Sequence, residues 1–218
     1  ANITFLMSGV FSLLGGWLVT RFRLRPLMIV GCGLPGLGLV IHSQAVSANA
    51  VYLARFLMGA SLGFIGVAPC VVLVSGWFEK GRGTALGITL VGTSLGGTII
   101  PLIAQPLIAN YGWRTAMLAL SGVVWFVLLP LVVFAIREKS NVQAEQTSDV
   151  VDGMSLAAAL RTRVFWALAA CSALVFYPIF ATSQQFVLYL QTPRIGVSAE
   201  TAAFAQSALF AISIGGKF

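Results

Sequence analysis

Polar side chains that could bind a solute lie within the long apolar stretches of this 218-residue sequence. Arg55 is the one basic residue well inside such a stretch, where a charge in a hydrocarbon environment is costly unless it is paired. No apolar stretch contains an acidic residue, so the guanidinium must find a backbone carbonyl, an anionic solute or a group on another segment, or reach outward to the membrane surface. Reversible binding of an anion is the chemistry that this position allows.

Uncharged polar side chains form a second set of candidates. A phenol, a hydroxyl and two amides cluster around Pro178: Tyr177, Ser183, Gln184 and Gln185. Such groups need hydrogen-bonding partners in an apolar environment. A water-filled cavity provides them, and so do hydrogen bonds between helices, and the sequence leaves both alternatives open. The same alternatives apply to three residues of an earlier stretch: Thr93, Ser94 and Gln105.

The sequence contains no pattern typical of an enzyme or of a metal or cofactor site. It has no Ser/His/Asp set, no paired carboxylates and no HExxH pattern. Its three cysteines each lie in an apolar stretch without CxxC spacing. Residues 31–36 spell GxGxxG, but they follow no soluble strand and no acid lies about 20 residues further on. His42, near the end of an apolar stretch, could sense protons, although an interfacial histidine is the simpler interpretation.

The composition indicates a membrane protein. Hydrophobic residues make up 58% of the chain and charged residues 9%, outside the range of soluble globular domains. The net charge of +7 arises from short basic clusters between apolar stretches, not from a basic face with interleaved aromatics, so nucleic acid is not an expected partner. We expect a lipid bilayer to surround the chain.

Seven apolar stretches are expected to be transmembrane helices, because about 20 residues cross the hydrocarbon layer. They cover residues 3–20, 26–45, 51–77, 83–109, 115–136, 164–190 and 201–216, the last a little short. The fold class is therefore an all-α polytopic membrane protein. Residues 137–163 are polar and are predicted to be a cytoplasmic loop that joins one bundle, residues 1–136, to the start of another, residues 164–218.

Basic residues give the expected orientation. Alternate loops on one side carry most of them: Arg21, Arg23, Arg25, Lys80, Arg82, Arg137, Lys139, Arg161, Arg163 and, at the end of the last stretch, Lys217. The opposite side has only Arg114 and Arg194. The first side is therefore predicted to be cytoplasmic. We expect a multi-pass protein of a bacterial inner membrane.

Glycines recur near the start of the fourth stretch. Those predicted to let it approach another helix closely are Gly83, Gly87, Gly92 and Gly96. Pro101 and Pro106 further along would let the helix bend.

Several motifs, in order, resemble the major facilitator superfamily over nearly the whole chain. Residues 16–25, GWLVTRFRLR, are similar to its loop signature G-x-L-x-D-R-x-G-R-R, with Thr20 in place of the Asp. Residues 55–59 are similar to its fourth-helix signature and residues 111–114 to its loop between helices five and six. The segment from Phe78 to Gly96 is most like the monocarboxylate porter and oxalate/formate antiporter branch.

The resemblance implies a cytoplasmic gate. Its residues here are Gly16, Arg21, Arg25, Glu79, Lys80 and Arg82. We expect Glu79 to pair with Arg21 or Arg25 in place of the missing Asp. The alternative is that these basic residues only set topology and attract anionic lipid.

The resemblance also implies the function. On the superfamily's numbering the seven stretches are helices two to eight of twelve, so the chain is expected to be a fragment. Arg55 would act in coupling or binding, and helix seven, with Tyr177, would face the cavity. The expected function is secondary transport of a small organic anion, such as a monocarboxylate, by alternating access with proton symport or anion exchange. Export of drugs or other solutes is an alternative, as is a non-transporting scaffold or an enzyme subunit.

Overall fold

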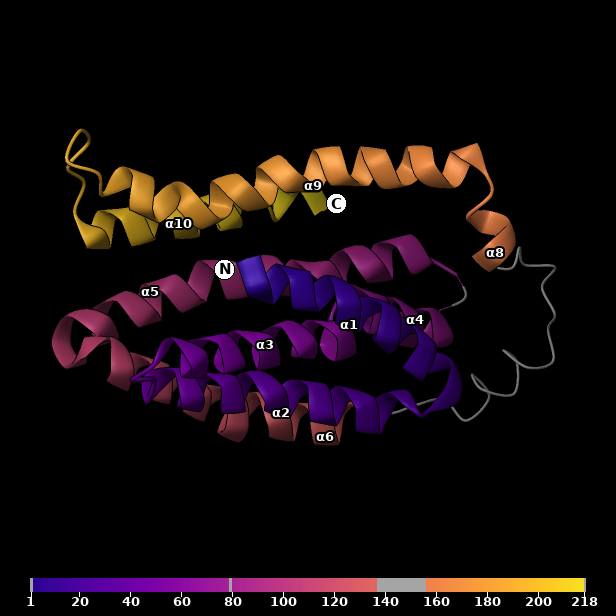
Figure 1. The fold of residues 1–218 in the computed structure, drawn as a ribbon, viewed down its shortest axis with the longest axis horizontal. Coiled ribbons are helices and arrows are strands. Elements are labelled where there is room, and N and C mark those ends of the chain that lie inside the picture. Colours follow the sequence, from indigo (N-terminus) through magenta and orange to yellow (C-terminus); the bar gives the residue numbers. More distant parts are fainter. Residues whose placement is uncertain (1, 79, 137–155, 218) are drawn as a thin grey trace. The chain divides into compact units, whose positions relative to one another are not determined.

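The chain is helical in a computed structural model that describes residues 2–78, 80–136 and 156–217 (Figure 1). Helices and short connections make up these residues, with no strand among them. The predicted all-α membrane fold is therefore confirmed. The chain divides into two compact units, one of Ala1–Lys139 with Ser207–Phe218 and one of Ser140–Gln206.

The first unit begins with α1 (Asn2–Arg21), α2 (Leu24–Ser43) and α3 (Ala48–Ile65). The Ser47 side chain caps α3 by accepting a hydrogen bond from the backbone N–H of Ala50 at 3.4 Å. Gly66, with φ −69° and ψ −167°, then interrupts the helical backbone before α4 (Val67–Trp77). The predicted single stretch 51–77 is therefore two consecutive helices.

Glycines let α1 and α3 approach closely. A Cβ atom on Gly59 would lie 2.6 Å from the carbonyl oxygen of Thr4, and one on Gly63 would overlap the backbone of Phe11. The Phe11 ring packs edge-on against Phe56 with a centroid distance of 5.5 Å. Gly59 and Gly63 are four residues apart, which places both on one face of α3. Small residues at this spacing are typical of close helix packing in membranes.

The longest helical segment bends at one glycine. It consists of α5 (Arg82–Val123), the π-helical turn η1 (Val124–Leu128) and α6 (Leu129–Ala135). Gly112 in α5 has φ 80° and ψ 162°, a conformation that glycine adopts almost alone. Figure 1 shows the chain turning back on itself in α5. The two predicted stretches 83–109 and 115–136 lie on either side of this bend.

Two contacts join α2 to the segment beyond the bend. The indole of Trp125 in η1 lies against Gly36, where a Cβ atom would overlap the ring. The Arg25 guanidinium donates a hydrogen bond to the carbonyl oxygen of Val133 at 2.7 Å. Trp125 therefore packs against α2.

The second unit contains α8 (Leu156–Ala159) and α9 (Arg163–Leu190). The Thr162 hydroxyl caps α9 by accepting from the backbone N–H of Phe165 at 3.3 Å. α10 (Ala199–Ile212) begins in this unit, and from Ser207 onward the chain belongs to the first. Residues 213–217 form a turn and the 3₁₀ turn η2 (Gly215–Lys217).

Four helical segments of the described residues have the length and apolar composition to cross a membrane: Leu24–Ser43, Ala48–Trp77, Arg82–Phe134 and Arg163–Leu190. The apolar segment Ile3–Val19 is slightly shorter. The third segment includes the bend at Gly112 and so contains two of the predicted spans. The predicted helix 201–216 is shorter than expected, because α10 ends at Ile212 and the two glycines that follow are in a 3₁₀ turn.

Candidate functional site

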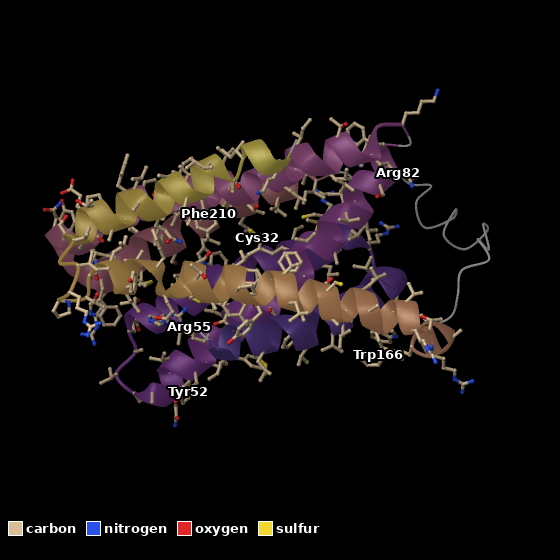
Figure 2. All side chains as sticks on the ribbon, turned by 90° about the horizontal axis from the view of Figure 1, so that it is seen from above. Cys32, Tyr52, Arg55, Arg82, Trp166 and Phe210 are labelled. Carbon is tan, nitrogen blue, oxygen red and sulfur yellow. The ribbon has the colours of Figure 1, made fainter. Side chains whose placement is uncertain are left out.

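Arg55 lies on α3, seven residues beyond its first residue and therefore about 10 Å along the helix. The side chain is half-buried, and no described residue forms a hydrogen bond or ion pair with its guanidinium. Figure 2 shows Arg55 and Arg82 toward opposite ends of the first unit. Within the described residues, Arg55 is thus a helix-borne cation without a counterion.

The end of α2 is tied to the bend of α5. The His42 ring packs edge-on against the Trp113 indole at a centroid distance of 6.2 Å. The Arg114 guanidinium lies 5.0 Å over the same indole and donates a hydrogen bond of 3.4 Å to the carbonyl oxygen of Ala45. His42 Nδ1 is buried and has no hydrogen-bond partner among the described residues. Arg114 therefore has a structural role at a helix end.

The polar residues of α5 lie at a contact with the segment 207–217. The Thr93 hydroxyl donates to the carbonyl oxygen of Leu90 at 2.7 Å. The Lys217 ammonium donates to that carbonyl at 2.5 Å and to Thr93 Oγ1 at 2.6 Å. One turn on, the hydroxyl oxygens of Ser94 and Ser213 are 2.6 Å apart, and Ser94 is only 1% exposed.

Two glycines extend this contact in both directions. A Cβ atom on Gly87 would lie 2.8 Å from the carbonyl oxygen of Lys217, and one on Gly97 would lie 2.5 Å from the Phe210 ring. Positions 87, 90, 94 and 97 share one face of α5 at helical spacing. Their partners run in the opposite order, from 217 back to 210. We name this antiparallel contact between residues 87–97 and 210–217 the α5–α10 seam.

The seam includes only one of the four glycines that the sequence predicts to pack closely. Gly87 is within it. A Cβ atom on Gly83, Gly92 or Gly96 would meet no atom of the described residues within 4 Å. The close approach elsewhere on α5 is at Gly97 instead. A packing role for Gly83, Gly92 and Gly96 stays a prediction.

Lys217 contacts α5 at Leu90 and Thr93, and its predicted position on the cytoplasmic side stays a prediction. Leu90 and Thr93 follow Arg82 by 8 and 11 residues, which is about 12–17 Å along the helix axis. The Lys217 ammonium therefore lies two to three turns beyond the first residue of α5.

The remaining predicted pathway residues have few contacts. Gln105 on α5 is half-buried without a hydrogen bond to any described residue. In the second unit, Tyr177 is 77% exposed, and Gln184 and Gln185 are exposed on α9. The Ser183 carbonyl accepts a hydrogen bond from the Gln206 amide at 3.5 Å. These residues of α9 belong to the second unit and Arg55 belongs to the first, so a cavity that they share with Arg55 stays a prediction.

The basic residues of the expected gate contact neutral groups. The Arg21 guanidinium lies 4.9 Å over the Trp17 ring. Arg25 donates to the Val133 carbonyl, as described above, and Arg82 Nε donates to the Phe78 carbonyl at 2.9 Å.

Two other members of the gate motif, Lys80 and Gly16, lie in open surroundings within the described residues. Lys80 is exposed, and Gly16 has open space around its Cα, whereas the neighbouring Gly15 is the one that packs on α3. Glu79 lies outside the described residues, so its predicted pairing with Arg21 or Arg25 stays a prediction.

Sequence reasoning missed Lys217 and Ser213 as site candidates. Ser213 lies in the predicted span 201–216, and Lys217 follows it, where the sequence predicts that the chain emerges on the cytoplasmic side. The available signal was the helical spacing of Gly87, Ser94 and Gly97 in one segment and of Ser213 and Lys217 in the other, since small and polar residues then share one helix face in each segment.

Comparison with known proteins identifies the relatives of this chain. Monocarboxylate transporter 12 of Xenopus laevis is 33% identical over 112 residues, which cover 51% of this chain and 24% of that protein. Monocarboxylate transporter 11 of Mus musculus is 34% identical over 112 residues, 51% of this chain and 25% of that protein. Riboflavin transporter RibJ of Trypanosoma brucei brucei is 32% identical over 116 residues, 53% of this chain and 21% of that protein.

The matched residues span about a quarter of the length of these relatives, which are transporters and not enzymes. The family model of the Major Facilitator Superfamily matches residues 1–218. Its motifs, its helices and this match agree: the chain belongs to the major facilitator superfamily.

Proposed function

We propose that this chain forms part of a secondary transporter for a small organic anion, such as a monocarboxylate. The transporter works by alternating access, coupled to proton symport or to exchange of one anion for another. Members of the superfamily are integral multi-pass membrane proteins. The relatives named above come from animals and a trypanosome, so the expected bacterial inner membrane stays a prediction.

The observation that carries the proposal is Arg55. Its guanidinium is within a membrane-spanning segment and has no ion-pair partner among the described residues. Glu200 is the one carboxylate side chain that these residues contain, and it belongs to the second unit. A charge in this environment is stable only when it is hydrated or paired. A carboxylate solute supplies the missing negative charge, and names of the relatives indicate the same class of solute.

The arrangement of the chain in the proposed transporter follows the sequence prediction. Residues 1–136 are helices two to six, residues 137–163 are the central cytoplasmic loop, and residues 164–218 begin a second bundle with helices seven and eight. Tyr177, Ser183, Gln184 and Gln185 then line the pathway from helix seven. Thr93 and Gln105 line it from helix five.

A second candidate solute is an uncharged or larger molecule, because one relative is named a riboflavin transporter. The two candidates differ in what Arg55 must do. A carboxylate needs the guanidinium as a counterion, whereas a neutral solute needs only hydrogen bonds from groups such as Tyr177 and Gln184.

Uptake into proteoliposomes tests the proposal. The protein expressed from its complete reading frame is reconstituted, and uptake of labelled pyruvate, oxalate and riboflavin is measured. An inward proton gradient is imposed in one series, and the liposomes are preloaded with unlabelled anion in another. We expect a carboxylate to accumulate in one of the two series, which also identifies symport or exchange. Riboflavin uptake without carboxylate uptake would replace the proposal by the second candidate, and binding without flux would replace it by a scaffold.

A further inference from the structure

A small cluster of side chains holds the end of α2 at the bend of α5. We name this cluster the His42 clamp, and its members are His42, Ala45, Trp113 and Arg114. The His42 ring packs edge-on against the Trp113 indole at a centroid distance of 6.2 Å, and the Arg114 guanidinium lies 5.0 Å over the same indole. That guanidinium also donates to the Ala45 carbonyl oxygen at 3.4 Å, just beyond the last turn of α2. One indole therefore lies beside both a histidine and a permanent cation.

His42 is the one residue of the clamp that can change its charge near neutral pH. It is also the one histidine of the 218-residue sequence. Its ring is half-buried, and its Nδ1 atom is buried without a hydrogen-bond partner among the described residues. The described part of the first unit contains no carboxylate side chain. A protonated His42 would thus have no counterion there, and burial disfavours a charge that is not compensated.

The side chains on the neighbouring elements add positive charge. Gly38 packs against Ala54 and Met58 of α3, so His42, one turn further along α2, lies beside the turn of α3 that precedes Ala54. This part of α3 and the bend of α5 together contain four charged or titratable side chains: Tyr52, Arg55, Tyr111 and Arg114. Neither η1 nor α6 contains one. Tyrosine is neutral near pH 7, so the charges that a protonated His42 would face from these elements are two guanidinium groups.

The short helix α4 also packs on α2, and its one titratable side chain is distant from the clamp. The Cys70 thiol donates to the Ile65 carbonyl oxygen at 3.6 Å. Ile65 in turn packs at Gly31, which precedes His42 by about three helical turns. Within the described residues, the clamp therefore has neither an acid nor a thiol beside it.

We propose that the His42 clamp is a pH-sensitive device: it is closed while His42 is neutral, and protonation of His42 releases the end of α2 from the bend of α5. An imidazolium and the Arg114 guanidinium would be two like charges at one indole, and like charges repel each other. In the released state the ring reaches water, which favours its charged form. The proposal goes beyond the proposed function, because it needs no particular solute.

The direction of the pH effect follows from proton binding. The released state binds one more proton than the closed state, so a falling pH favours release and a rising pH favours closure. Release also separates the Arg114 guanidinium from the Ala45 carbonyl. Ala45 is 9% exposed in the closed clamp, whereas the next residue, Val46, is 93% exposed. Opening of the clamp should therefore be measurable as access to position 45.

Cysteine labelling at positions 45 and 46 tests the clamp without measuring transport. Ala45→Cys and Val46→Cys are introduced separately into the complete protein after its native cysteines are replaced by alanine. The rate of reaction with N-ethylmaleimide is measured in detergent micelles, where both ends of the helices meet the same pH, between about pH 8 and pH 5. The ratio of the rate at position 45 to the rate at position 46 corrects for the smaller thiolate fraction at low pH. We expect this ratio to rise by about fivefold or more as the pH falls, a common size for coupling between sites.

Variants of the clamp residues complete the test. With His42→Gln the ratio should not depend on pH, because glutamine does not titrate. Arg114→Gln should raise the ratio already at pH 8, whereas the matched control Arg194→Gln, whose side chain is exposed in the second unit, should behave like the parent. Gel filtration of each variant confirms that it is folded. The proposal is overturned if the ratio is constant in the parent, if it changes equally in His42→Gln, or if Arg114→Gln leaves position 45 as protected as in the parent.

Discussion

The hydroxyl oxygens of Ser94 and Ser213 are 2.6 Å apart, although 119 positions separate these residues in the sequence. Ser94 is buried to 1% exposure, so water does not compete for this hydrogen bond. The pair therefore marks the register in which residues 207–217 pack on α5. In the same register, Lys217 packs on α5 to one side of this pair and Phe210 packs on α5 to the other side.

The Ser94–Ser213 pair should show energetic coupling. We expect Ser94→Ala and Ser213→Ala to destabilise the protein together by less than the sum of the single changes, with a coupling free energy of about 0.5–1.5 kcal/mol. Unfolding by SDS in mixed micelles measures the four free energies of the cycle. Strictly additive effects would mean that the two hydroxyls do not interact in the membrane protein.

The contact of α1 with α3 predicts a steric effect at Gly63. Gly63→Ala should lower the free energy of unfolding by about 1–3 kcal/mol, because the new Cβ atom overlaps the Phe11 backbone and the helices must separate. Gly9→Ala on α1 is the matched control, since open space surrounds it and alanine favours a helix. Equal stability of the two variants would contradict the close packing.

The bend of α5 predicts a conformational effect at Gly112. Its φ of 80° with ψ of 162° is unfavourable for any residue with a Cβ atom. Gly112→Ala should therefore cost about 1–3 kcal/mol in the same unfolding measurement. Gly122→Ala, further along the same helix and also in open space, should not be destabilising. A neutral Gly112→Ala would show that the chain does not turn at this residue.

The predicted orientation can be tested by labelling. In a variant without native cysteines, Lys80→Cys should be protected from a membrane-impermeant maleimide in intact cells, and Arg194→Cys should react. The reason is that basic residues concentrate on the cytoplasmic side. Permeabilised cells provide the control, in which both positions react. The reverse pattern would invert the proposed topology and place the seam near the outer face.

Local features of the fold were predictable from the sequence, because helix length and hydropathy depend on neighbouring residues. The spans on either side of Gly112 and the long α9 are examples. The end of α10 at Ile212 was not predictable, since the apolar composition continues to Gly216 while the helix does not.

The site was less predictable than the fold. Arg55 is identifiable from its own position as a charge in an apolar stretch. The contact of Lys217 with Leu90, across 127 positions, depends on which helix faces which, and that information is not local. The glycines at 83, 87, 92 and 96 show the same limit: the sequence suggested a packing role for all of them, and among them only Gly87 lies on the face opposite residues 210–217.

The most direct test of the central claim is the initial rate of carboxylate uptake by the complete protein with Arg55→Gln. A hydrogen bond to a charged group contributes about 1.5–3 kcal/mol, so the variant should lose at least about tenfold in rate at low carboxylate concentration. Arg114→Gln is the matched control, because its guanidinium contacts the Ala45 carbonyl and the Trp113 ring at the end of α2, and it should stay within about threefold of the parent. A rate for Arg55→Gln equal to that of Arg114→Gln would contradict the assignment of Arg55 as the anion-binding group.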